Sequence, residues 1–172
     1  MNDAQIYIRV ATGHDGEKLR GMFARASAET IYRRFHIPYP EVPEWMVAMM
    51  LGTDHLDKES LVAVAEEKII GHAMYARLGD DHEAEMAIIV EDGWQSKGVG
   101  KSLLSGLAER AKRRGIETFT GEVLATNGPM LGLADMFVGT DHTIDDGVYH
   151  VRMLLQTPEP ATHTARTIRR AA

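Results

Sequence analysis

The residues with the clearest chemical potential form a short polar loop that contains two glycines. The loop reads Gln95-Ser96-Lys97-Gly98-Val99-Gly100-Lys101-Ser102, and it lies between an apolar run that ends at Val90 and a segment with helical periodicity. Glycine lets the backbone turn so that successive N–H groups point into one space, and a following helix adds the positive end of its dipole. We therefore predict that residues 95–102 bind a pyrophosphate.

Two common phosphate-binding motifs do not fit this loop. A P-loop requires G-x-x-x-x-G-K-[ST], and Gly100-Lys101-Ser102 matches its end, but position 95 holds Gln where the first glycine is required. A dinucleotide fingerprint needs a third glycine where Leu103 stands, and no short βαβ unit begins the chain. The pattern Gln-x-x-Gly-x-Gly remains.

The elements that must position this loop follow from hydrophobic periodicity. Apolar residues alternate over 6–10, which predicts a strand, and three apolar runs with short connections, 61–65, 69–76 and 84–90, predict an antiparallel meander. Further strands are predicted over 116–124 and 148–155. Helices are predicted over 14–26, 28–35, 44–51 and 127–137, and after the glycine loop as far as Gly115. The stretch near 140–147 is expected to be a loop.

Length and composition limit the class of protein. A chain of 172 residues is long enough for one core, and we expect a single domain over 1–156 followed by a flexible basic tail over 157–172. The net charge of −6 argues against sequence-independent nucleic-acid binding. The absence of Cys excludes disulfides and thiolate metal sites. Without a signal peptide or a long apolar run, a cytoplasmic protein that does not bind membranes is expected.

Histidines and serines offer little further chemistry. The 8 histidines form no H-E-x-x-H motif, and no Ser lies in a G-x-S-x-G elbow, so neither a metal site nor hydrolase chemistry is predicted. His72 is one exception, because it lies in the central predicted strand and could approach Glu85.

The hexapeptide Gln95-Ser96-Lys97-Gly98-Val99-Gly100 resembles the R/Q-x-x-G-x-G/A motif of the GNAT family of acetyl-CoA-dependent N-acetyltransferases. The order of predicted elements over about residues 5 to 155 is similar to that of the family as well. The resemblance implies an α/β fold, a single acyl-CoA N-acyltransferase domain in which helices flank a mixed, mostly antiparallel sheet. The sheet would be splayed near the end of the 84–90 strand.

The resemblance also implies how acetyl-CoA, as co-substrate and without a metal, is bound. Loop amides would hold the pyrophosphate, a backbone N–H near Ile89 or Val90 would polarise the thioester, and Asn127 would contact the coenzyme arm or cap the next helix. Ser102 is either a phosphate ligand or an ordinary first-turn serine. The expected coenzyme-binding residues are Ile88, Ile89, Val90, Gln95, Ser96, Lys97, Gly98, Val99, Gly100, Lys101, Ser102, Asn127 and Met130.

Glu85 is the candidate catalytic base. It shares one face of the predicted 84–90 strand with Ala87 and Ile89, and apolar neighbours that raise its pKa would suit it to deprotonate an ammonium. The alternative is a solvent-facing strand residue, and Glu83, on the same face, is the second candidate. Ala84-Glu85-Met86-Ala87 followed by Trp94-Gln95 is similar to bacterial GNAT enzymes that acetylate protein lysines, in which a Glu at this position is the base.

The sequence departs from the family at the general acid. Many members carry a Tyr seven residues after the Asn that matches Asn127, and position 134 is Ala. The usual Gly-Phe pair that closes this helix is replaced by Val138-Gly139. Tyr149 is a distant substitute, and water or transfer from the attacking nitrogen is equally open.

The acceptor is expected to be a primary amine. A protein lysine is favoured, because Arg25, Arg33 and Arg34 could meet an acidic partner surface and no acidic pocket is evident between residues 14 and 51. Two alternatives stay open, namely a small-molecule amine acetyltransferase and a catalytically silent acyl-CoA sensor. A homodimer is a further expectation.

Overall fold

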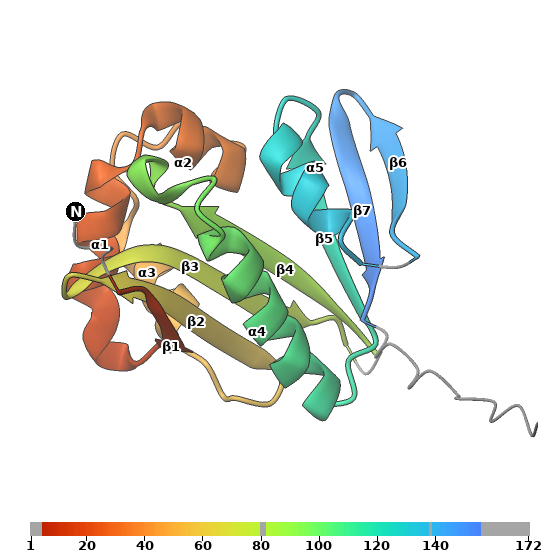
Figure 1. Ribbon diagram of the computed structural model, residues 1–172, viewed down its shortest axis with the longest axis horizontal. Coiled ribbons are helices and arrows are strands. Elements are labelled where there is room, and N and C mark those ends of the chain that lie inside the picture. The colour runs from red at the N-terminus through yellow and green to blue at the C-terminus, as the bar shows by residue number, and fades with distance from the viewer. Residues whose placement is uncertain (1–4, 80–81, 138, 156–172) are drawn as a thin grey trace, which may run out of the picture.

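The computed structural model describes residues 5–79, 82–137 and 139–155. They form one seven-stranded sheet in the order β1-β2-β3-β4-β5-β7-β6. All neighbouring strands are antiparallel except β4 and β5, which are parallel. Figure 1 shows this sheet with helices on both faces. The predicted mixed, mostly antiparallel α/β sheet is confirmed.

The elements follow one another in a simple order along the chain. The strands are β1 (Tyr7–Val10), β2 (Lys58–Ala65), β3 (Lys68–Arg77), β4 (Glu83–Val90), β5 (Thr118–Leu124), β6 (Asp141–Asp145) and β7 (Val148–Leu154). The α-helices are α1 (Gly16–Arg25), α2 (Ala28–Phe35), α3 (Glu44–Leu51), α4 (Val99–Arg113) and α5 (Gly128–Ala134). Two 3₁₀ turns, η1 (Gly13–Asp15) and η2 (Asp92–Trp94), precede α1 and the glycine loop.

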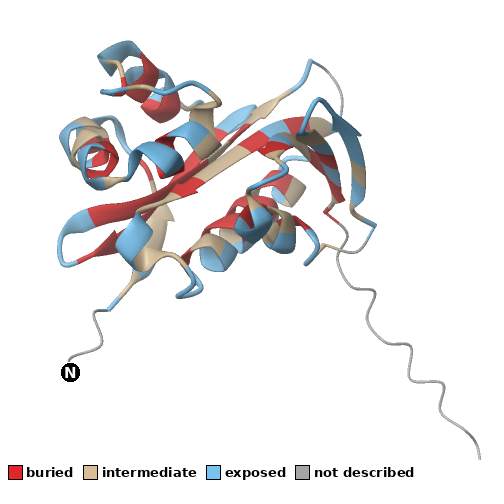
Figure 2. Ribbon diagram, turned by 90° about the horizontal axis from the view of Figure 1, so that it is seen from above, coloured by how far each residue is buried: buried red, intermediate tan, exposed pale blue. Residues whose placement is uncertain are grey.

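The sheet separates two hydrophobic cores. Alternation along β2 directs Val62 and Val64 to the side of α1, α2 and α3, and Leu61 and Ala63 to the side of α4. Both faces of the central strands are therefore covered, and β2 and β3 are buried along most of their length (Figure 2). This explains why their sequences are almost continuously apolar.

Two predicted segments differ from the structure. The helix expected over 127–137 ends at Ala134, where the Thr140 hydroxyl donates hydrogen bonds of 2.8 Å to the carbonyl oxygens of Ala134 and Phe137. The prediction of a loop over 140–147 is wrong, because residues 141–145 form β6, an edge strand paired with β7. Asp146 and Gly147 make the turn between them with φ of 43° and 77°. The tail over 157–172 lies outside the described residues.

Candidate active site

The site begins where β4 and β5 diverge. The two strands pair over only three positions, Glu83 with Thr118, Ala84 with Phe119 and Glu85 with Thr120. The next residue of β5 is Gly121, whose lack of a side chain lets the two backbones stay close. A Cβ at this position would lie 3.3 Å from the carbonyl oxygen of Met86 in β4. Beyond it, residues 87–90 of β4 and 122–124 of β5 have no register partner in each other. The expected splay is present.

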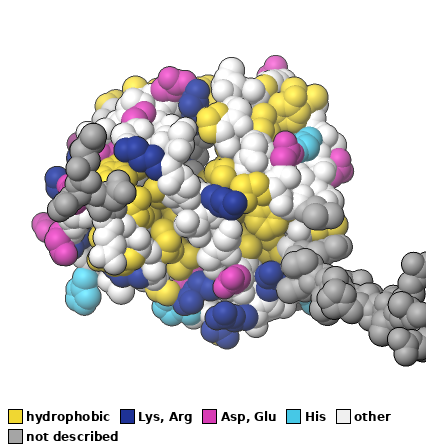
Figure 3. Space-filling view, viewed as in Figure 1, with side chains coloured by type: hydrophobic (Ala, Val, Ile, Leu, Met, Phe, Trp, Pro, Cys, Tyr) yellow, Lys and Arg dark blue, Asp and Glu magenta, His cyan; other side chains and the backbone are white. Residues whose placement is uncertain are grey.

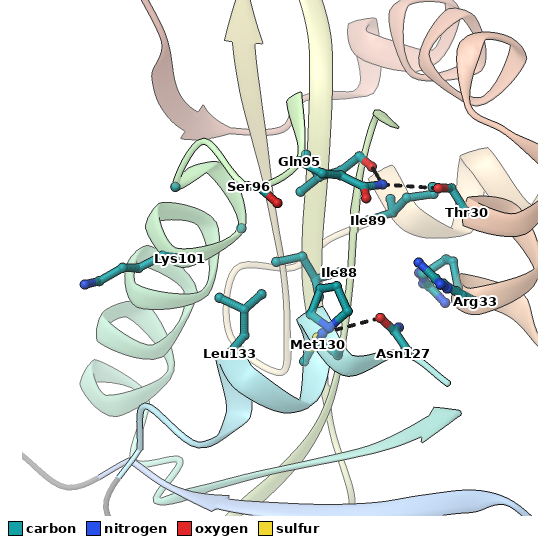
Figure 4. Close-up of a pocket in the computed structure, with 15 residues that line it drawn as sticks. Thr30, Arg33, Ile88, Ile89, Gln95, Ser96, Lys101, Asn127, Met130 and Leu133 are labelled. Carbon is teal, nitrogen blue, oxygen red and sulfur yellow. Dashed lines mark hydrogen bonds between the residues drawn. The ribbon is translucent and has the colours of Figure 1, made fainter. Parts of the chain in front are cut away.

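Two cavities occupy this opening. The first, of about 320 Å³, is shown in Figure 4 and reaches from the glycine loop to α2. It is lined by Thr30, Arg33, Arg34, Ile88, Ile89, Val90, Gln95, Ser96, Gly98, Gly100, Lys101, Asn127, Pro129, Met130 and Leu133. Figure 3 shows hydrophobic and basic side chains beside a hollow in this face of the molecule.

The second cavity, of about 230 Å³, lies on the β5 side of the splay and is more polar. It is lined by Arg33, Arg34, Phe35, His36, Glu85, Met86, Ala87, Ile88, Gly121, Glu122, Val123, Asn127 and Met130. The two cavities share five lining residues, Arg33, Arg34, Ile88, Asn127 and Met130. They therefore meet at the middle of β4.

The glycine loop has the geometry of an anion-binding turn. Ser96 and Gly98 adopt positive φ of 60° and 82°, and Gly98 is the N-cap of α4. The first helical hydrogen bond joins the Ser102 amide to the Gly98 carbonyl at 3.0 Å, so the amides of residues 99–101 precede the helical ladder. These free N–H groups and the helix dipole favour a bound phosphate.

Most of the predicted coenzyme-binding residues line the first cavity. Ten do so: Ile88, Ile89, Val90, Gln95, Ser96, Gly98, Gly100, Lys101, Asn127 and Met130. Three others, Lys97, Val99 and Ser102, are not part of the lining. Val99 is buried in the core, the Lys97 ammonium lies 5.0 Å from the Trp94 ring centre, and Ser102 is exposed on α4. The backbone amides of Lys97 and Val99 remain candidates for phosphate contact, whereas the Ser102 amide already donates to the Gly98 carbonyl.

Gln95 and Asn127 are both used for internal hydrogen bonds. The Gln95 side-chain amide donates to the Val90 carbonyl at 2.9 Å and to the Thr30 hydroxyl at 3.1 Å, which ties the end of β4 to α2 (Figure 4). The Asn127 side-chain oxygen accepts a 3.3 Å hydrogen bond from the Met130 amide, so Asn127 caps α5. Both residues therefore shape the cavity wall.

The turn before the loop is held to α1 and α2 by two carboxylates. Glu91 accepts hydrogen bonds of 2.8–3.1 Å from the Arg25 guanidinium. Asp92 accepts from the Ser27 amide at 2.8 Å, the Ser27 hydroxyl at 2.7 Å and the Thr30 hydroxyl at 2.9 Å. Desolvation alone would raise the pKa of Asp92, but these hydrogen bonds lower it below its ordinary value. Arg25, expected to meet a partner surface, forms this ion pair within the chain while its side chain stays 36% exposed.

Glu85 is exposed on β4 and faces the second cavity. The prediction that apolar residues surround Glu85 is wrong, because Arg33, Arg34 and His36 from the end of α2 line the same cavity. Glu83 lines neither cavity and pairs with Arg152 of β7. Of the two candidate carboxylates, only Glu85 is placed beside the splay.

His72 is a core residue. It is 0% exposed, and its Nε2 lies 2.7 Å from the Ser60 hydroxyl. Burial, together with the charge of Arg34, lowers the pKa of His72 to about 3. In the sheet it stands opposite Ile89, whereas Glu85 stands opposite Ala76, so the expected approach to Glu85 is wrong.

No tyrosine among the described residues lines either cavity. Ala134, where a Tyr was expected from the family pattern, is fully buried. Tyr149, the distant substitute, is half-buried on β7, with its ring 6.0 Å from that of His142. Within the described ranges, no phenol is therefore placed at either cavity to act as a general acid.

Five lining residues of the first cavity were not predicted: Thr30, Arg33, Arg34, Pro129 and Leu133. They come from α2 and α5, and only the folding of these helices over the splay brings them to the loop. Local spacing carries no signal for such contacts. The Arg33-Arg34 pair at a helix end had been assigned to a partner surface instead.

Among the residues that the structure describes, no group of three or more His, Cys, Asp or Glu side chains is placed to hold a metal ion. No helix in the described ranges has the length and apolar character needed to cross a membrane.

A sheet that opens beside a glycine loop at a helix N-terminus defines a class of domain that binds an extended, phosphorylated co-substrate. The model of the acetyltransferase (GNAT) family matches residues 24–139, and the chain belongs to this family. The resemblance recognised in Gln95–Gly100 is thereby confirmed.

Individual relatives refine this placement. The GNAT domain of S. lividans PAT is 31% identical, with a TM-score of 0.79 over 86% of this chain and 89% of that one. The acetyltransferase Pat of Mycolicibacterium smegmatis is 28% identical over 132 residues, which are 75% of this chain but 39% of that protein. The chain thus spans about two-fifths of that relative. These matches confirm the predicted closeness to bacterial protein lysine acetyltransferase domains.

A second solved structure bears on the fold. The yncA protein from Salmonella typhimurium, solved with its cofactor acetyl-CoA, has a TM-score of 0.69 and 22% identity over 93% of this chain and 98% of that one. At this identity the likeness concerns the fold alone.

Proposed function

We propose that this chain transfers an acetyl group from acetyl-CoA directly to a lysine side chain of a protein. The observation that carries the proposal is the meeting of two cavities at Ile88, Asn127 and Met130. One cavity leads to the anion-binding loop, and the other leads to the Glu85 carboxylate. A donor and an acceptor that enter from opposite sides would meet at the middle of β4.

The chain's own residues fit the donor. The amides of residues 99–101 and the Lys101 ammonium suit the pyrophosphate, and the unpaired edge of β4 over 87–90 offers backbone groups to an amide-containing arm. A side chain at Gly100 would fill this cradle, because its Cβ would lie 3.0 Å from Leu133. Membership of the acetyltransferase (GNAT) family supports this choice of donor.

Glu85 is the base in this proposal. An ammonium in the second cavity loses a proton to Glu85, and the free nitrogen attacks the thioester carbonyl. The C–N bond forms, the C–S bond breaks, and the electron pair leaves on the coenzyme sulfur. With no tyrosine among the described residues of either cavity, the thiolate takes its proton from the attacking nitrogen or from water.

A protein lysine is favoured over a small amine for two reasons. The second cavity carries two guanidiniums beside the carboxylates of Glu85 and Glu122, whereas a polycationic amine calls for a wall of carboxylates alone. The relatives that match at 28–31% identity are Pat proteins.

The proposal is tested by acetylation of a chemically deacetylated bacterial lysate. The protein is incubated with acetyl-CoA and the lysate, with a panel of polyamines and aminoglycosides in parallel, and modified lysines are mapped by mass spectrometry. We expect specific lysines to gain acetyl groups above the background of the Glu85→Gln variant. Efficient turnover of a small amine without lysine modification would overturn the proposal.

A further inference from the structure

Arg34 is a cation without a counter-ion among the residues that the structure describes. It lies in the last turn of α2, is half-buried, and lines both cavities. It forms no hydrogen bond or ion pair with the described residues, and its Nε is buried without a partner. Its guanidinium carbon lies 4.8 Å from the centre of the Phe35 ring, and the charges of Arg34 and Glu85 influence each other without a salt bridge.

Neighbouring arginines are paired, which sets Arg34 apart. Arg25 binds Glu91 through a 2.8 Å ion pair, and Arg33 binds Glu29 at 2.5 Å, although the Nε of Arg33 is also buried and unpartnered. Burial lowers the pKa of Arg34 to about 10, and the charge of Glu85 opposes this shift only in part. At neutral pH the guanidinium is therefore charged and poorly solvated. A half-buried charge in this state is stabilised when an anion pairs with it.

The position of Arg34 indicates which part of the reactants would carry that anion. The donor's phosphates are assigned to the glycine loop, and Figure 4 shows Lys101 and Arg33 at opposite sides of the first cavity. The end of the cavity at α2 opens into the second cavity, where the acyl group must meet the amine. Glu85 and Glu122 also line the second cavity, but neither forms an ion pair with Arg34. A further negative charge beside Arg33 and Arg34 would therefore reduce their repulsion of an approaching ammonium.

We propose that Arg34, with Arg33 beside it, binds the carboxylate at the far end of a dicarboxylic acyl group. The donor class is an ω-carboxyacyl-CoA such as succinyl-CoA. Guanidinium and carboxylate match as planar, bidentate partners. The inference rests on the proposed function and extends it to a second acyl group.

The transfer of such a group involves the same bonds as acetyl transfer. Glu85 removes a proton from the acceptor ammonium, the nitrogen bonds to the thioester carbonyl carbon, and the C–S bond breaks with its electron pair on sulfur. The thiolate is protonated by the nitrogen or by water. The distal carboxylate stays ionised and unchanged, and no other reactant is consumed.

The test compares two donors that have equal chain length and differ in charge. Calorimetry measures the Kd of succinyl-CoA and butyryl-CoA for the wild type, for Arg34→Gln, and for the control Arg20→Gln, which changes an exposed arginine paired with Glu44 of α3. We expect the wild type and Arg20→Gln to bind succinyl-CoA at least tenfold more tightly than butyryl-CoA. In Arg34→Gln this ratio should fall to near one. A ratio near one in the wild type, or an unchanged ratio in Arg34→Gln, overturns the inference.

A second measurement separates the donor from the acceptor as source of the carboxylate. Turnover is followed by thiol release with the lysines found above, in peptides that carry either Glu or Gln beside the lysine. If Arg34→Gln lowers turnover only for the Glu peptides and leaves the donor ratio unchanged, the carboxylate belongs to the acceptor and the inference is wrong. Because the binding ratio needs no acceptor, it remains decisive even if no amine is acetylated and the proposed function fails.

Discussion

Replacing Gly100 by Ala should weaken coenzyme binding while leaving the fold intact. The new methyl group would lie 3.0 Å from Leu133 Cδ1, 3.9 Å from Val90 Cγ2 and 4.0 Å from Ile88 Cδ1, all in the lining of the first cavity. Alanine is the better helix former by about 0.5–1 kcal/mol, which offsets the displacement of Leu133. We therefore expect the free energy of unfolding to change by less than about 1 kcal/mol.

Binding should respond more strongly than stability. Loss of one charge-assisted hydrogen bond to the pyrophosphate costs about 1.5–3 kcal/mol, or roughly tenfold to a hundredfold in the Kd of acetyl-CoA. Calorimetry measures this Kd, and urea unfolding measures stability. The matched control is Gly106→Ala in the same helix, where the added Cβ lies 3.3 Å from Leu61 Cδ1, away from the cavity lining. A wild-type Kd in folded Gly100→Ala, or an equal loss in Gly106→Ala, would refute the assignment of the loop.

Four further variants test the base and the buried titratable groups. Glu85→Gln should leave the Kd of acetyl-CoA nearly unchanged and lower kcat by about 10²–10⁴-fold. If Glu83→Gln loses turnover and Glu85→Gln does not, Glu83 is the base and the assignment of Glu85 is wrong. Hydrogen bonds from Arg9 outweigh burial and hold the pKa of Asp15 below its ordinary range. The ionised Asp15 therefore stabilises the fold fully above about pH 4, and this contribution is lost as the pH falls further. Urea unfolding of Asp15→Asn should give about 2–4 kcal/mol less stability than the wild type at pH 7 and a smaller difference below pH 4. The pKa of His72 is lowered to about 3 in the folded protein, from an unfolded value near 6.5. The free energy of unfolding of the wild type should therefore fall by about 1.4 kcal/mol per pH unit below pH 6.5. Equal acid sensitivity in His72→Gln would show that His72 is not the cause of this fall.

The sequence predicted the meander, the loop and most of the first cavity because these features depend on local order. A glycine pattern between a strand and a helix fixes its own geometry, and alternation in β4 places Glu85 on a definite face. The turn of β6 also had a local signal, since Asp146-Gly147 is a typical two-residue hairpin turn. It was missed because residues 141–145 form an exposed edge strand with little apolar alternation.

Contacts between distant elements could not be predicted in this way. Arg33 and Arg34 were correctly placed near the end of a helix, but nothing in their spacing indicates that α2 covers the splay. The surroundings of Glu85 were wrong for the same reason, since its strand is apolar along the chain while its neighbours across the cavity are guanidiniums. Likewise, the register of β3 against β4 decides that His72 faces Ile89.

The short pairing of β4 with β5 also bears on how this fold resists aggregation. An unpaired strand edge attracts strands of other chains, and proteins usually shorten, charge or cover their edges. Here the backbone of residues 87–90 in β4 and 122–124 in β5 lacks register pairing across the splay, yet α2 and α5 contribute to the cavity walls that enclose it. A co-substrate that enters the cavities can reach this interior edge, whereas α2 and α5 stand beside it where a strand from another molecule would have to pair. The fold thus keeps an open set of backbone donors and acceptors without the usual risk of intermolecular sheet extension.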